Sequence, residues 1–116
     1  MKISVEEKNG ISIFRMVGDV DINTSPELKT SFDEVTNGAG LKVILNLKNV
    51  DYVDSSGLAT MVEILKGLRN GSGRLKLTNL SAKVKGLFEI TKLTQLFDIF
   101  DEEDEAVNSF GQPDSC

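Results

Sequence analysis

The chain has 116 residues, of which 40% are hydrophobic, and this length and composition suit one domain with its own core. Its formal charge is −5, from 13 basic and 18 acidic residues, so it lacks the basic balance of a nucleic-acid-binding protein. Histidine is absent, which excludes an imidazole-based nucleophile system and a His-ligated zinc site.

The first two predicted elements form an antiparallel hairpin. Residues 2–8 alternate between apolar and polar side chains, which is the period of a half-exposed strand. Asn9 and Gly10 follow, and this dipeptide is typical of a two-residue turn whose backbone needs positive φ angles. Residues 11–17 are then predicted to form the returning strand.

A polar turn over residues 18–24 leads into the first predicted helix. We expect Thr24 to be the N-cap and Glu27 to complete a capping box, in which each side chain bonds the backbone N–H of the other. Pro26 suits the first turn because its missing N–H would have had no partner. The residues Asn37 to Gly40 are predicted to end the helix.

The rest of the chain alternates strands and helices. Residues 41–47 are almost continuously apolar, as in a strand covered on both faces, and an amphipathic helix is expected from about residue 55 to residue 70. A strand over 74–78, a helix capped by Ser81 and a short strand over 96–100 are expected next.

The carboxyl-terminal part is strongly acidic, with seven acids and no base over residues 98–116. We place Asp101 at the N-cap of a final helix, so that the acids after it lie in the first turn and complement the helix dipole. Residues 111–116 are expected to form a flexible tail.

This order of elements predicts an α/β domain over residues 1–110. Strands joined through helices form right-handed crossovers and lie parallel, so only the opening hairpin is antiparallel. We therefore expect a mixed sheet of four or five strands with about four helices. The chain has no apolar run long enough for a membrane span and no apolar stretch near its start, so we expect a cytoplasmic protein without a membrane contact.

The residues from Asp54 to Gly57 carry the most informative local pattern. They join a parallel strand to a helix, at the sheet edge where open α/β sheets bind ligands. The hydroxyl of Ser55 would lie at a helix N-terminus, where anions are favoured, so it is a candidate phosphoryl acceptor. Gly57 would leave the first turn bare for the close approach of another molecule. Simple helix capping selects the same residue types, so the pattern alone leaves both interpretations open.

The turn before the first helix is a second candidate. In this topology Asp21, Asn23 and Thr24 would lie near Asp54 and form a polar rim around Ser55. A solvated turn with a helix cap explains the same residues, because turns and caps favour these side chains.

Three motifs in this order resemble the bacterial anti-sigma factor antagonists of the STAS domain family, and the likeness spans nearly the whole chain. The motifs are Gly18-Asp19-Val20-Asp21, Asp54-Ser55-Ser56-Gly57-Leu58 and Lys83-Val84-Lys85-Gly86-Leu87-Phe88. The resemblance implies a single STAS domain that is not an enzyme, has no cofactor and acts by binding other proteins. A monomer is expected.

The resemblance also implies a switch. The unphosphorylated protein would bind a serine kinase that is also an anti-sigma factor, and would thereby free the sigma factor. The kinase would use its own ATP to phosphorylate Ser55, which ends binding, and a separate serine phosphatase would reset the protein. Ser56 is not expected to be the acceptor. The predicted partner-binding residues are Asp21, Asn23, Thr24, Asp54, Ser56 and Gly57.

One alternative remains at this point, and two others are disfavoured by the residues. STAS domains without phosphorylation serve as scaffold subunits in stress signalling and as accessory subunits of lipid-transport machinery. A receiver domain would use Asp54 as its phosphate acceptor and Lys92 as its late lysine, but it needs a helix after its first strand, where Asn9 and Gly10 lead into another strand. A hydrolase built on Ser55 would have no histidine to activate it.

Overall fold

The chain opens with the predicted hairpin of β1 (Lys2–Lys8) and β2 (Ile11–Val17), which pair antiparallel. The computed structural model describes residues 1–35 and 40–111. In it, Asn9 and Gly10 have φ angles of 55° and 78°. The turn therefore has the positive φ angles that this dipeptide favours.

The sheet has five strands in the order β1-β2-β3-β4-β5, and every pair after the hairpin is parallel. The later strands are β3 (Lys42–Asn49), β4 (Arg74–Thr78) and β5 (Asp98–Phe100). The helices are α1 (Ser25–Val35), α2 (Ser55–Asn70), α3 (Ala82–Ile90), the short 3₁₀ helix η1 (Leu93–Gln95) and α4 (Glu103–Gly111). The predicted mixed sheet with four α-helices is confirmed.

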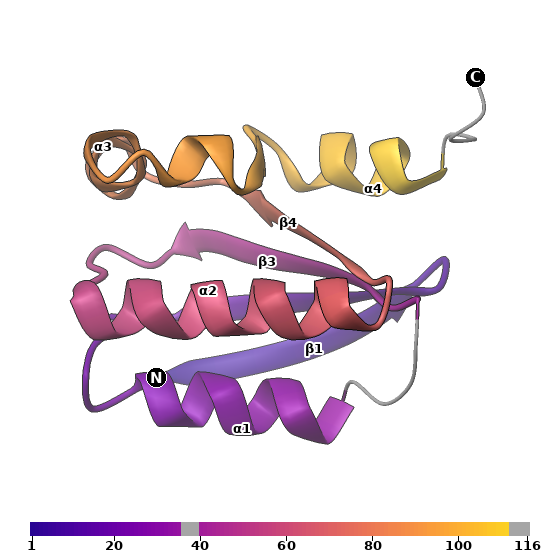
Figure 1. Cartoon of the computed structure of the whole chain (residues 1–116), viewed down its shortest axis with the longest axis horizontal. Helices are drawn as coiled ribbons and strands as arrows, with labels where there is room; N and C mark the ends of the chain where they lie inside the picture. Colours follow the sequence, from indigo (N-terminus) through magenta and orange to yellow (C-terminus); the bar gives the residue numbers. More distant parts are fainter. Residues whose placement is uncertain (36–39, 112–116) are drawn as a thin grey trace.

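Helices cover both faces of this sheet, and α4 lies on the opposite side from α1 and α2 (Figure 1). The alternation along each strand explains the two layers, since Leu45 packs into the core under α1 and α2 while its neighbour Ile44 packs under α4. Both side chains are fully buried, as expected of a central strand. None of the helices in the described ranges is long and apolar enough to cross a membrane.

The expected capping box at the start of α1 is wrong. The Thr24 hydroxyl turns back into the preceding turn, where it accepts the Asp21 N–H at 2.9 Å and donates to the Asp19 carbonyl at 2.6 Å. Glu27 points elsewhere, with its carboxylate 3.9 Å from the amino group of Met1. The carboxylate of Asp21 accepts the N–H groups of Asn23 and Thr24, which lie in the turn before the helix.

The expected N-cap of α4 is one residue too early. The helix begins at Glu103, so Glu102 occupies the capping position, and its N–H donates to the Glu105 carboxylate at 3.1 Å. Asp101 lies 3.9 Å from the ammonium of Lys85 instead. The expected end of α1 over residues 37–40 lies outside the described residues except for Gly40. The expected tail over residues 111–116 begins one residue too early, because Gly111 is the last residue of α4, and residues 112–116 lie outside the described ranges.

Long-range polar contacts attach α4 to the sheet. Arg15 on β2 donates two hydrogen bonds to the carboxylate of Glu103, at 2.9 and 2.8 Å, and Asn46 on β3 donates a third at 2.9 Å. The Arg15 hydrogen bonds hold the pKa of Glu103 below its usual value, although partial burial opposes them. This cluster sets where the last helix lies on the sheet.

Candidate functional site

Two turns lie side by side beyond the carboxyl ends of β2 and β3, and together they form the candidate site. The first turn covers residues 18–24, and the Ser55 turn covers residues 50–57. Val20 donates its N–H to the Tyr52 carbonyl at 2.9 Å, and its carbonyl accepts the Asp54 N–H at 3.1 Å. These bonds make a short parallel bridge between Val20 and Val53, which joins the two turns.

Asp54 fastens the two turns through both oxygens of its carboxylate. Oδ1 accepts the N–H of Gly57 at 2.9 Å and thereby caps α2. Oδ2 accepts the N–H of Ile22, in the first turn, at 3.1 Å. Asp54 is therefore the N-cap of α2, which the sequence had left open as one interpretation, and the contact with Ile22 shows that the same side chain also positions the neighbouring turn.

Ser55 is the first residue of α2 and is exposed. Its hydroxyl forms no hydrogen bond within residues 1–35 and 40–111. The N–H groups of Ser55 and Ser56 are likewise without an acceptor in those ranges, because Gly57 is the one bonded to the cap. Ser56 is partly covered, whereas the Ser55 oxygen is open to another molecule beside two free backbone donors.

The role predicted for Gly57 has to be corrected. Gly57 is buried, and a Cβ built on it would lie 2.4 Å from the Val20 carbonyl oxygen and 3.0 Å from Cγ1 of Val53. The start of α2 therefore lacks a side chain at Gly57 so that the turn over residues 18–24 of this same chain can pack against it. Gly57 positions the Ser55 turn and leaves no space there for a second molecule.

The structure places the remaining predicted residues at the same edge. The Asp21 carboxylate is held by hydrogen bonds from the N–H groups of Asn23 and Thr24, Asn23 is exposed and Thr24 is partly covered. The two turns carry four carboxylates, those of Asp19, Asp21, Asp51 and Asp54. A negative charge added at Ser55 would enter surroundings that are already acidic.

Exposed apolar side chains beside Ser55 were missed in the sequence. Ile22 is 69% exposed, Tyr52 44% and Ile90 82%, although large apolar residues are usually covered. Two features of the sequence could have predicted them. Ile22 is an apolar residue within a polar turn, and Ile90 does not share the apolar face of α3 that Val84 and Phe88 form.

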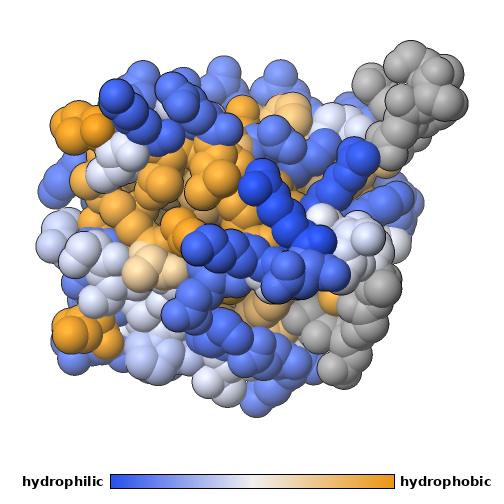
Figure 2. All heavy atoms as spheres, in the orientation of Figure 1, coloured by the Kyte–Doolittle hydropathy of each residue, from blue (hydrophilic) through white to orange (hydrophobic). Residues whose placement is uncertain are grey.

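Tyr52 and Ile90 border a groove between residues 51–53 and α3, with a volume of about 340 Å³. Figure 2 shows hydrophobic side chains gathered in the area between α2 and α3. One side of the groove is formed by residues 51–53 of the Ser55 turn itself.

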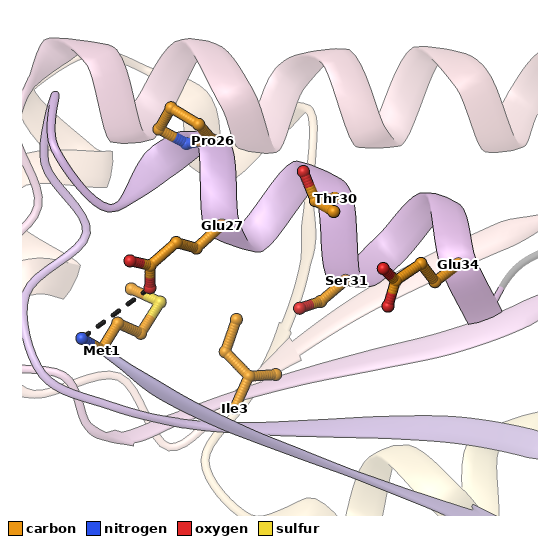
Figure 3. Close-up of a pocket in the computed structure, with 7 residues that line it drawn as sticks. All are labelled: Met1, Ile3, Pro26, Glu27, Thr30, Ser31 and Glu34. Atoms are coloured by element: carbon orange, nitrogen blue, oxygen red, sulfur yellow. Dashed lines mark ion pairs between the residues drawn. The ribbon is translucent and has the colours of Figure 1, made fainter.

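A larger hollow of about 460 Å³ lies between β1 and α1. Figure 3 shows that carboxylates and hydroxyls from α1 face Met1 and Ile3 across it, and the amino group of Met1 pairs with Glu27 at 3.9 Å. It has no lining residue in common with the Ser55 turn. Across the described ranges, no cluster of three acidic or cysteine side chains is arranged to hold a metal ion.

Comparisons with known proteins found similar sequences over nearly the whole chain. The family model "STAS domain" matches residues 2–106. The anti-sigma-B factor antagonist of Listeria monocytogenes is 35% identical over 109 residues, covering 90% of this chain and 95% of the relative. The protein of the same name from Bacillus subtilis is 36% identical over 103 residues, covering 85% and 92%.

Solved structures show the same fold. The anti-sigma factor antagonist SpoIIAA in its unphosphorylated form superposes with a TM-score of 0.70 at 19% identity, over 97% of this chain and 100% of that chain. SpoIIAA has also been solved in a phosphorylated form, which matches with a TM-score of 0.67. This fold therefore occurs both with and without a phosphate.

Proposed function

Because the chain belongs to the STAS domain family, we propose that it is an anti-sigma factor antagonist controlled by phosphorylation of Ser55. The observation that carries the proposal is the state of Ser55 at the first position of α2. Its hydroxyl is exposed and free of hydrogen bonds within the described residues, while Asp54 holds the surrounding backbone in place. The names of the curated relatives supply the class of partner, an anti-sigma factor.

The partner in this proposal is a serine kinase that brings its own ATP. The Ser55 oxygen attacks the γ-phosphorus, the bond from that phosphorus to the β,γ-bridging oxygen breaks, and ADP leaves. The hydroxyl proton passes to a base of the kinase, because this chain has no histidine and nothing on it is hydrogen-bonded to Ser55 within the described residues. The chain contributes an acceptor held at a fixed position.

The fold tolerates the product at Ser55. A phosphoserine carries about −1.5 to −2 charges at neutral pH, and the free N–H groups at the start of α2 favour an anion there. The first turn and the Ser55 turn are already tied together by Asp54 and Val20, so no large rearrangement is needed. The change is therefore one of surface charge.

The kinase surface cannot tolerate the same charge. To transfer phosphate it must place nucleotide phosphates against Ser55, so a phosphate on Ser55 meets like charge in a contact from which water is excluded. The carboxylates of Asp21 and Asp54 add to this repulsion. A loss of about 100-fold in affinity requires about 2.8 kcal/mol, which one badly placed double charge can supply. A serine phosphatase that removes the group would restore binding.

Phosphate transfer to the purified protein tests the proposal. The protein is mixed with ATP and, one at a time, the serine-kinase anti-sigma factors encoded by its own genome, and the added phosphate is mapped by mass spectrometry. We expect one phosphate on Ser55, none on Ser55→Ala, and a phosphate still mapped to Ser55 in the matched variant Ser56→Ala. Transfer to Ser56, or none with any of these kinases, would contradict the proposal and leave an unphosphorylated interaction module as the alternative.

A further inference from the structure

The groove is an apolar hollow between α3 and residues 51–53, which are part of the Ser55 turn. Its floor and walls come from Val53, Val84 and Leu87, and its rim from Tyr52 and Ile90. Ile90 is the most exposed large apolar residue of the described chain, at 82%. An apolar rim left in water at this volume is typical of a surface that another protein covers.

We infer that this groove is a second docking point for the kinase partner, which inserts one apolar side chain between Tyr52 and Ile90. The inference rests on the proposed function, since the protein that occupies the groove is the kinase that phosphorylates Ser55. Continuity favours this occupant over others: Tyr52 and Val53 line the groove, and the next two residues are the helix cap Asp54 and the acceptor Ser55. A protein that covers Ser55 therefore reaches the groove without a gap.

Charge at the rim adds to the fit. The ammonium of Lys83 lies 5.6 Å from the centre of the Tyr52 ring and forms no ion pair within the described residues. Asp51 is exposed on the same rim. Because Lys83 is a cation beside the apolar groove, the matching partner segment presents an apolar side chain with an acidic neighbour that faces Lys83. This is the usual arrangement of a buried apolar anchor surrounded by charged residues.

The two docking points have separate tasks. The Ser55 turn senses the phosphate, whereas the groove contributes affinity that does not depend on the phosphorylation state. Burial of a whole isoleucine side chain accounts for about a tenfold to 100-fold change in affinity. Loss of the groove contact should therefore raise the KM of phosphate transfer to Ser55 by the same factor and leave kcat unchanged, because Ile90 does not touch the reacting atoms.

The test compares Ile90→Ser with Val5→Ser in the full chain. Val5 is a matched control because it is also an exposed apolar residue, at 38%, and it lies on β1 at the other edge of the sheet. The kinase that phosphorylates Ser55 is titrated by calorimetry against each variant, and thermal melting confirms that both are folded. We expect Ile90→Ser to bind at least about tenfold more weakly than wild type and Val5→Ser to bind as wild type.

Each other result overturns one specific statement. Wild-type affinity of Ile90→Ser refutes the groove, and if Ser55→Asp has still lost binding the proposed function stands. Full binding of Ser55→Asp to this kinase refutes the proposed function, whatever Ile90 does. A wild-type dimer that Ile90→Ser turns into a monomer would assign the groove to a second copy of this chain and contradict the inference.

Discussion

Replacing Gly57 by alanine is expected to destabilise the fold, because the added Cβ has no space. It would lie 2.4 Å from the Val20 carbonyl oxygen and 2.9 Å from Cγ1 of Val20, and the backbone oxygen cannot move aside without breaking its bond to the Asp54 N–H. Overpacking of this kind costs about 1–3 kcal/mol, while alanine regains up to about 1 kcal/mol of helix propensity. Because the closest contact is with a backbone atom, the clash belongs in the upper part of that range, so the net loss is about 1–2 kcal/mol.

The same helix supplies the control. Gly67 is also inside α2, but a Cβ there would meet nothing within 4 Å, so Gly67→Ala should stabilise by about 0.5–1 kcal/mol. Thermal unfolding followed by circular dichroism measures the Tm of both variants. In a chain of this size, a change of about 1 kcal/mol in the unfolding free energy shifts Tm by about 4 °C. We expect Tm to fall by about 4–8 °C for Gly57→Ala and to rise for Gly67→Ala. A Gly57→Ala protein as stable as wild type would refute the packing explanation.

Two further changes test the contacts that position the site and the last helix. Asp54→Ala should lower the unfolding free energy by about 1–2 kcal/mol in urea, since it removes both the helix cap and the acceptor for Ile22, and Asp54→Asn should cost less because one acceptor remains. A loss in Asp54→Asn equal to that in Asp54→Ala would contradict this account. Glu103→Gln should cost about 1 kcal/mol at pH 7. Pairing with Arg15 lowers the pKa of Glu103 from 4.5, so the advantage of wild type should persist above that pH and be lost as the pH falls below it. An advantage that is the same at pH 7 and pH 3 would contradict the pairing.

Local patterns were enough to predict most of the fold. The Asn9-Gly10 turn, the apolar run before residue 48 and the start of α2 each depend on neighbouring residues in the chain, which a sequence displays directly. The cap of α1 could not be read in this way. Thr24 has the right type and spacing, but its hydroxyl satisfies Asp19 and Asp21 in the turn, and only the path of that turn decides between the two.

Contacts between distant residues were out of reach of the sequence. The residues that join α4 to the sheet, Arg15 and Glu103, are 88 positions apart and show no pattern that links them. The same holds for the candidate site. Asp54 and Ser55 could be predicted from the strand-to-helix turn, but the close contact of Gly57 with Val20 and the groove beside Ile90 depend on how separate elements pack.

The affinity of the kinase for this protein before and after phosphorylation of Ser55 is the most direct test of the central claim. The protein is phosphorylated to completion, repurified and titrated against the same kinase by calorimetry, with Ser55→Ala taken through the same treatment. We predict that phosphorylation weakens binding by about 100-fold, equivalent to about 2.8 kcal/mol, and that treated Ser55→Ala keeps the affinity of the unphosphorylated protein. Equal affinity of the phosphorylated and unphosphorylated proteins would contradict the claim that charge at Ser55 is the switch.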